Sequence, residues 1–64
     1  MKIYSVEATA GPAVASGQTV KKGQVLGRDI ENRNLTADFS GKIKKIQFNG
    51  KDHCFEIYLE ELPE

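Results

Sequence analysis

The segment Gly17-Gln18-Thr19-Val20-Lys21-Lys22-Gly23-Gln24-Val25-Leu26 decides how the rest of the chain is interpreted. Its glycines and apolar residues follow the pattern Gly-x-x-Val-x-x-Gly-x-x-Leu, whose spacing of three fits neither an amphipathic helix nor a flat strand. Glycine permits left-handed or crowded backbone, while Val20 and Leu26 are spaced to point inward. The pattern therefore predicts a compact turn between strands, fastened to the core by Val20 and Leu26.

Short β-strands are expected around this turn, because six glycines and two prolines interrupt the chain and leave no window for an amphipathic helix. Runs of β-forming or alternating residues predict six strands, at residues 2–8, 13–15, 24–30, 35–39, 42–48 and 53–59. In the third run, Leu26, Arg28 and Ile30 share one face, as in a strand covered on one side. Alternation in other runs predicts further residues that share a face, namely Tyr4, Val6 and Ala8; Leu35, Ala37 and Phe39; and Phe55, Ile57 and Leu59.

The C-terminal half contains a predicted irregularity and a predicted hairpin. Between Ile43 and Ile46 the apolar phase slips by one residue, which predicts a β-bulge near Lys44 and Lys45. The dipeptide Asn49-Gly50 predicts a tight hairpin, because both residue types adopt positive φ readily. Residues 61–64 are expected to form an exit or linker stub.

Composition describes a single small domain with an ordinary surface charge. With 64 residues the chain forms one domain, residues 1–64, near the lower size limit for a core without covalent staples. Nine basic and nine acidic residues cancel, so neither a nucleic-acid partner nor an acidic tail is expected. The lone cysteine, Cys54, excludes an internal disulfide and suits a reducing compartment. Since residues 1–7 lack the apolar region of a signal peptide, we expect a cytoplasmic protein without a membrane partner.

Two phrases of the chain resemble the biotinyl/lipoyl carrier family. Residues 17–26 are similar to the family phrase G-D-x-V-x-x-G-Q-x-L, and Ala37-Asp38-Phe39-Ser40-Gly41-Lys42-Ile43 is similar to A-P-x-S-G-x-V. The phrases occur in the family's order, and the resemblance covers residues 10–48. It implies an all-β fold, a small barrel-sandwich hybrid. Such a fold is a flattened β-barrel of short antiparallel strands whose halves are related by a pseudo-twofold axis.

The lysine that would carry a cofactor in that family is missing here. The resemblance implies a hairpin whose tip presents a lysine, because biotin or lipoate is joined to the lysine ε-amine by an amide bond. This chain instead reads Asp29-Ile30-Glu31-Asn32-Arg33-Asn34-Leu35-Thr36, which is also shorter. The delocalised guanidinium of Arg33 is a poor nucleophile for acylation. We therefore expect no biotin or lipoate, and a displaced carrier lysine would be Lys21 or Lys22.

Two basic clusters are interpreted as solvated strand faces. They are Lys21-Lys22 and the group Lys42, Lys44 and Lys45. Together they could attract a phosphate-rich partner, but lysines on strands also discourage unwanted edge pairing. Balanced charge and the lack of an aromatic stacking platform favour the second interpretation.

No catalytic or metal site is predicted. His53 and Cys54 are adjacent on a predicted strand and so point to opposite faces, which disfavours a shared metal ion or a nucleophilic pair. Asp29 and Glu31 share a face, but a chain of this size rarely encloses the cleft that acid/base chemistry needs. Both carboxylates are interpreted as solvent-facing.

The sequence therefore predicts a non-catalytic interaction or scaffold module that binds a protein partner. The turn Asn32, Arg33 and Asn34 is the predicted contact surface, and an outward-facing Tyr58 could anchor a partner. Two alternatives stay open. One is a swinging-arm carrier modified at Lys21 or Lys22, and the other is an accessory module of a larger transport, electron-transfer or polymerase complex. Exposed strand edges around a small core also favour a homodimer.

Overall fold

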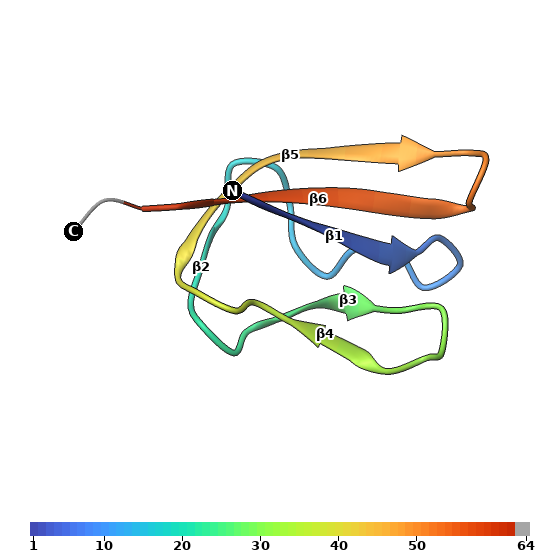
Figure 1. Ribbon diagram of the computed structural model, residues 1–64, viewed down its shortest axis with the longest axis horizontal. Coiled ribbons are helices and arrows are strands. Elements are labelled where there is room, and N and C mark those ends of the chain that lie inside the picture. The colour runs from blue at the N-terminus through green and yellow to red at the C-terminus, as the bar shows by residue number, and fades with distance from the viewer. Residues whose placement is uncertain (63–64) are drawn as a thin grey trace.

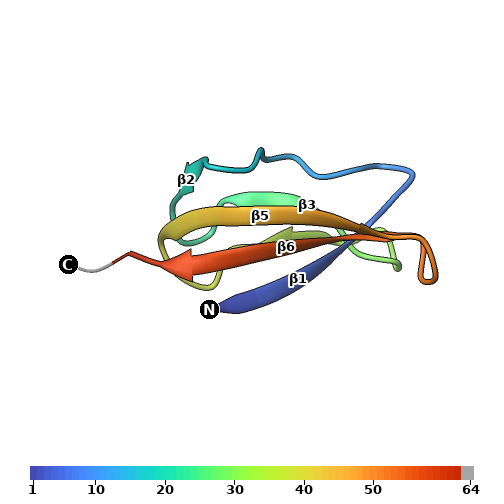
Figure 2. The same cartoon turned by 90° about the horizontal axis from the view of Figure 1, so that it is seen from above.

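All regular secondary structure in residues 1–62, which the computed structural model describes, is β-strand. The strands are β1 (Lys2–Glu7), β2 (Thr19–Val20), β3 (Val25–Arg28), β4 (Asn34–Thr36), β5 (Gly41–Asn49) and β6 (Cys54–Glu61). Four of them form an antiparallel sheet in the order β1-β6-β5-β2, and β3 pairs with β4 in a second sheet. The larger sheet curls toward the β3–β4 hairpin, so that the domain is barrel-like (Figures 1 and 2). The predicted all-β class is confirmed.

The core lies between the two sheets and the turns that join them. Its buried side chains are Tyr4, Val6, Val14, Val20, Leu26, Ala37, Ile43, Ile57 and Leu59. Leu35, Phe39, Ile46 and Phe55 pack against this cluster from its margin. The predicted inward orientation of Val20 and Leu26 is confirmed, since their exposed fractions are 1% and 0%.

The deciding segment and the residues before it contain the same turn twice, at residues 15–18 and 21–24. In each turn the glutamine N–H donates to the carbonyl of the first residue, at 3.1 and 2.9 Å. The glutamine Oε1 then accepts the N–H of that first residue, at 3.0 and 3.1 Å. The third residue of each is a glycine with φ of 88°, a conformation that only glycine adopts without strain. The six-residue offset between the two glycines thus encodes a repeated local structure.

Both turns are hydrogen-bonded to β5 or to the segment that precedes it. The first exchanges two backbone hydrogen bonds with Ile43, at 2.7 and 2.8 Å. The second exchanges two with Ala37, at 2.8 and 2.9 Å. Ile43 and Ala37 are buried, so the repeat holds two core residues six positions apart, the same separation as the turns themselves. The strand β2 lies between the two turns, inside the segment predicted as a turn alone.

The strand predicted at residues 13–15 is wrong. This segment forms no strand, and its Ala13 N–H donates instead to the carbonyl of Leu26 at 2.8 Å. It lies between Gly11 and Gly17, whose φ angles of 75° and 88° bend the backbone on both sides. Pro12 also lacks the N–H that a ladder would need.

The predicted alternation of Leu26, Arg28 and Ile30 is also wrong. The register of β3 against β4 shifts between Val25 and Gly27, so that Leu26 and Gly27 are both buried. Gly27 packs against β1, where an added Cβ would lie 2.6 Å from Cγ1 of Val6. The strand ends at Arg28, and Ile30 is 86% exposed.

The β5–β6 hairpin contains the predicted bulge but not the predicted tight turn. The pairing shifts between Ile43 and Lys45, which confirms the bulge near Lys44. Asn49 pairs with Cys54, so the connection spans residues 50–53 and is longer than a two-residue turn. Neither Asn49 nor Gly50 has the positive φ that a two-residue turn would need, and in this loop His53 has it instead, at 52°. The loop is shaped by the Asn49 side chain, whose Oδ1 accepts the N–H groups of Lys51 and Asp52.

The C-terminal stub was expected to begin at residue 61, but Glu61 is part of β6 and pairs with Gly41. Residues 63–64 of that stub lie outside the described residues. Within residues 1–62, no helix has the length and apolar character needed to cross a membrane.

Asp38 ties β1 to the segment that follows β4. The Tyr4 hydroxyl accepts the Asp38 N–H at 3.0 Å and donates to Asp38 Oδ2 at 3.1 Å. Lys2 Nζ forms an ion pair with the same carboxylate oxygen. The hydrogen bond from Lys2, followed by that from Tyr4, lowers the pKa of Asp38 below its usual value of 3.8.

Asp38→Asn is expected to make folding less sensitive to acid. Because the pKa of Asp38 is lowered by folding, its ionised form contributes stability above pH 3.8, and this contribution is lost as the pH falls below that value. The thermal midpoint of the wild type should therefore exceed that of the variant at pH 7, and the difference should narrow below pH 3.8. The difference in thermal midpoint is measured by thermal melts followed by circular dichroism at pH 7 and pH 3. A difference that is the same at both values contradicts the prediction.

Candidate interaction surface

The predicted contact turn lies at the tip of the β3–β4 hairpin, and Asp29 organises it. One carboxylate oxygen of Asp29, Oδ1, accepts the N–H groups of Glu31 and Arg33, both at 2.9 Å. The Asp29 carbonyl also accepts the N–H of Asn32 at 2.9 Å, and Asn32 has a φ of 65°. The Asp29 carboxylate therefore accepts backbone hydrogen bonds that shape the turn, while the Glu31 carboxylate pairs with Arg33.

The polar side chains of this turn bind mostly to one another. Arg33 Nη2 lies 2.9 Å from Glu31 Oε2, and both side chains are exposed. Arg28 Nη1 donates to the carbonyl and to Oδ1 of Asn32, each at 3.3 Å. Asn34 is the first residue of β4 and pairs with Arg28. Asn32, Arg33 and Asn34 are all exposed, and the side chains of Asn32 and Arg33 make contacts within the turn.

The lysines predicted as displaced carriers lie elsewhere. Lys21 and Lys22 belong to the second of the repeated turns, before β3 begins, and so at the opposite end of the β3–β4 pair from its tip. The N–H of Lys22 donates to Ser40 Oγ at 3.1 Å. The lysine that does lie in a hairpin loop is Lys51, between β5 and β6, which the sequence interpretation did not single out.

The outer edge of β1 has unpaired backbone groups. Ala8 N–H donates to the carbonyl of His53, at the position directly opposite in the β1–β6 register. Because ladder hydrogen bonds alternate along an antiparallel strand, even-numbered residues of β1 point their backbone groups toward β6. The N–H groups of Ile3, Ser5 and Glu7 therefore point away from the sheet, as do the carbonyls of Ile3 and Ser5. Among the described residues no strand pairs with this side of β1.

Two adjoining hollows follow this free edge. One, of about 530 Å³, lies between β1 and the β3–β4 hairpin and includes Ile3, Ser5 and Ile30 in its lining. The other, of about 470 Å³, lies beside the C-terminal part of β1 and is lined by Ser5, Glu7, Ile30, Asp52, His53 and Cys54. Ser5 and Ile30 belong to both, so we treat them as one groove, the β1 groove. Ile3 and Ile30 expose 50% and 86% of their surface, which gives the groove an apolar component.

Ile30 does not lie where the sequence pattern predicts. The alternation predicts that Ile30 shares a covered face with Leu26, whereas Ile30 is 86% exposed. The exposure of Ile30 is indicated in the sequence by its position between Asp29 and Glu31, because an apolar residue within a polar turn is not directed into the core. The signal could not be used without knowing that β3 ends at Arg28.

His53 and Cys54 both line the β1 groove, although they were predicted to face opposite ways. His53 lies in the hairpin loop and not on a strand, so strand alternation does not apply to it. Cys54 is half-buried. Across residues 1–62, no three side chains of the histidine, cysteine, aspartate or glutamate type are grouped as a metal ion would require.

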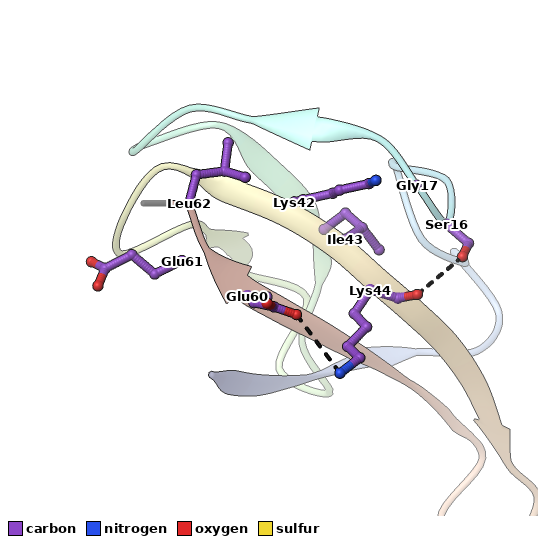
Figure 3. Close-up of a pocket in the computed structure, with 8 residues that line it drawn as sticks. All are labelled: Ser16, Gly17, Lys42, Ile43, Lys44, Glu60, Glu61 and Leu62. Carbon is purple, nitrogen blue, oxygen red and sulfur yellow. Dashed lines mark hydrogen bonds and ion pairs between the residues drawn. The ribbon is translucent and has the colours of Figure 1, made fainter. Parts of the chain in front are cut away.

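A separate hollow of about 360 Å³ lies where β5 begins and β6 ends, and it includes Lys42 and Leu62 (Figure 3). Lys44 Nζ approaches Glu60 Oε2 at 3.8 Å across the strand pair. The backbone of Ile43 is already bound by the first repeated turn. Two lysines and two glutamates of this lining thus offset each other in charge.

Tyr58 lies on the outer face of the large sheet, as predicted. It pairs with Ile3 on one side and with Lys45 on the other. Lys45 Nζ lies 4.5 Å from the centre of the Tyr58 ring, within the range of a cation–π interaction. The ring is therefore partly covered by a side chain of its own sheet.

No protein-family model matches the chain, and neither a curated protein nor a solved structure shows significant similarity to it.

Proposed function

We propose that this chain is a non-catalytic interaction module with a biotinyl/lipoyl-like fold, which binds a protein partner by accepting an extended segment of it along β1. The free backbone groups of Ile3, Ser5 and Glu7 carry this proposal. Strand addition to an exposed sheet edge uses main-chain hydrogen bonds for affinity and neighbouring pockets for selectivity. The β1 groove supplies such pockets next to the free edge.

The two edges of the large sheet differ in how they resist pairing, and this difference supports β1 as the binding edge. Beyond β2, the exposed part of β5 begins with a bulge and with Lys44 and Lys45. Bulges and lysines are the usual means by which proteins block edge pairing. Residues 3–7 contain no lysine or proline, and β1 pairs with β6 without a register shift. The edge is therefore open to a partner.

The family-like part of the proposal is supported by the two sequence phrases and by what they form. Residues 17–26 contain the last two residues of the first repeated turn and all of the second, and both turns are hydrogen-bonded to residues 37–43. The two phrases thus interact with each other through four backbone hydrogen bonds. The lack of a lysine between Asp29 and Asn34 supports a module that binds without a cofactor.

Ser5→Pro is expected to abolish strand addition while the domain stays folded. The Ser5 N–H points away from β6, so proline removes no hydrogen bond of the sheet but blocks a new strand. The probe is an eight-residue peptide of alternating valine and threonine, titrated into isotopically labelled protein and followed by NMR. Shift changes along β1 are expected for the wild type and for the matched control Ser5→Thr, and their loss for Ser5→Pro.

A second variant separates loss of binding from loss of folding. Ile30→Ser changes a side chain that is 86% exposed, so folding should be unaffected while affinity for the peptide falls several-fold. Shift changes centred on the Lys44 side of the sheet, or binding that survives Ser5→Pro, would rule out β1 as the site.

The swinging-arm carrier is a second candidate because of Lys51. Its amine lies on an exposed loop that closes the β5–β6 hairpin, and the Lys51 N–H is bound to Asn49 Oδ1 at 3.1 Å, which orders the loop. Intact-mass measurement after coexpression with a biotin or lipoate ligase tests it. An added cofactor mass that disappears in Lys51→Arg would support the carrier function, and an unmodified chain would contradict it.

A further inference from the structure

We infer that the segment added to β1 is basic, with a lysine or arginine set beside Glu7 and Asp52 and an apolar side chain against Ile3 and Ile30. This inference rests on the proposed function, and it specifies the chemistry of the partner. Three observations carry it: the charge of the groove, the distribution of that charge along β1, and the poor fit of a second copy of the chain.

The β1 groove is acidic in a chain that is neutral overall. Its lining contains one lysine, Lys2, and four carboxylates, those of Glu7, Asp29, Asp38 and Asp52, which gives a formal charge of −3. The whole chain carries nine residues of each sign and a net charge of zero. Negative charge is therefore concentrated along the edge that we propose accepts a strand. A partner of positive charge is the complementary one.

The charge is distributed unevenly along β1. At its N-terminal end, Lys2 and Asp38 form an ion pair and offset each other. At its C-terminal end, Glu7 and Asp52 line the same hollow, whose lining contains no lysine or arginine. A cation in the bound segment would therefore be placed at the Glu7 end and not at the Lys2 end.

Glu7 is held in its ionised form. Its Oε1 accepts the N–H of Thr9 at 2.9 Å, and its Oε2 accepts the N–H of Ala10 at 3.1 Å. The hydrogen bonds from Thr9, then that from Ala10, lower the pKa of this carboxyl below its usual value. These bonds also fix the side chain, and each oxygen keeps a lone pair for a cation. The position of the Asp52 side chain is fixed by a hydrogen bond, since its Oδ2 accepts from Asn49 Nδ2 at 3.2 Å.

A second copy of the chain fits this edge less well. In a twofold antiparallel pairing of β1 with β1 that is centred on Ser5, the outward backbone groups meet in register. That arrangement sets Ile3 of each copy opposite Glu7 of the other. No cation then faces Glu7, and an isoleucine is set against a carboxylate. A basic segment therefore complements the negative charge along β1 better than a second copy of the chain does.

The test compares three eight-residue peptides in which valine alternates with lysine, threonine or glutamate. At low ionic strength the lysine peptide should bind about tenfold more tightly than the glutamate peptide, since exposed ion pairs are each worth a few tenths of a kcal/mol to 1 kcal/mol and several change sign together. In the double variant Glu7→Gln with Asp52→Asn, this ratio should fall to about 2 or less, with the threonine peptide unaffected. Glu61→Gln is the matched control, because the Glu61 carboxylate is exposed and lies outside the groove, and this variant should keep the full ratio.

The outcomes separate the two proposals. Equal affinity for the lysine and glutamate peptides, with both lost in Ser5→Pro, would overturn the basic partner and leave strand addition intact. A ratio unchanged by the double variant would also overturn it. Light scattering that shows a dimer of the wild type and a monomer of Ser5→Pro, with no peptide bound by either, would assign the edge to a second copy. Failure of all three peptides to bind a monomeric protein would overturn strand addition itself.

Discussion

Gly41→Ala is expected to destabilise the folded state by about 3 kcal/mol, near the upper end of what overpacking usually costs. Gly41 lies where β5 is flanked by both β2 and β6, paired with Val20 on one side and Glu61 on the other. A Cβ at this position would lie 2.3 Å from the carbonyl oxygen of Glu60 and 3.1 Å from Cδ1 of Leu59. Since the nearest obstacle is backbone, no side-chain rotation relieves the contact. The strand must move or the pairing must break.

Urea denaturation followed by circular dichroism measures this effect. Gly50→Ala is the matched control, because its added Cβ would meet only Phe48 Cε2, at the ordinary distance of 3.4 Å. We expect Gly50→Ala to remain within about 1 kcal/mol of the wild type. Similar losses in the two variants would mean that Gly41 is not held against β6 as closely as the register requires.

Leu26→Ala is expected to cost about 2–5 kcal/mol, the range observed when a large buried side chain leaves a cavity. Leu26 is 0% exposed and connects the small sheet to the core shared with the large one. A folded chain of 64 residues has a total stability of only about 3–10 kcal/mol. The variant should therefore be largely unfolded, or close to it, at 37 °C.

The neighbouring Val25 provides the control for this change. It belongs to the same strand but is 39% exposed, so Val25→Ala removes little buried surface. Thermal melts should show a loss several times larger for Leu26→Ala than for Val25→Ala. Comparable losses would show that the two-stranded sheet contributes little to the common core, which would contradict the packing described above.

Part of the interaction surface could be anticipated from the sequence and part could not. Free strand edges and an outward-facing Tyr58 were expected from alternation. The contact turn at Asn32-Arg33-Asn34 is predicted because polar residues of a hairpin tip are exposed, and it stays a prediction; the structure adds that the Asn32 and Arg33 side chains make contacts within the turn. Ile30 was missed because its exposure depends on where β3 ends.

Local chemistry was enough to specify several features from the sequence by itself. Gly17 and Gly23 specify their turns because only glycine adopts their φ without strain, and the phase slip after Ile43 specifies the bulge. Tertiary structure alone decided the course of β3, because the space above Gly27 is filled by Val6 from a distant strand. It also decided that β1 is an edge, since strand order in a sheet depends on contacts between residues far apart in the chain, which no local pattern encodes.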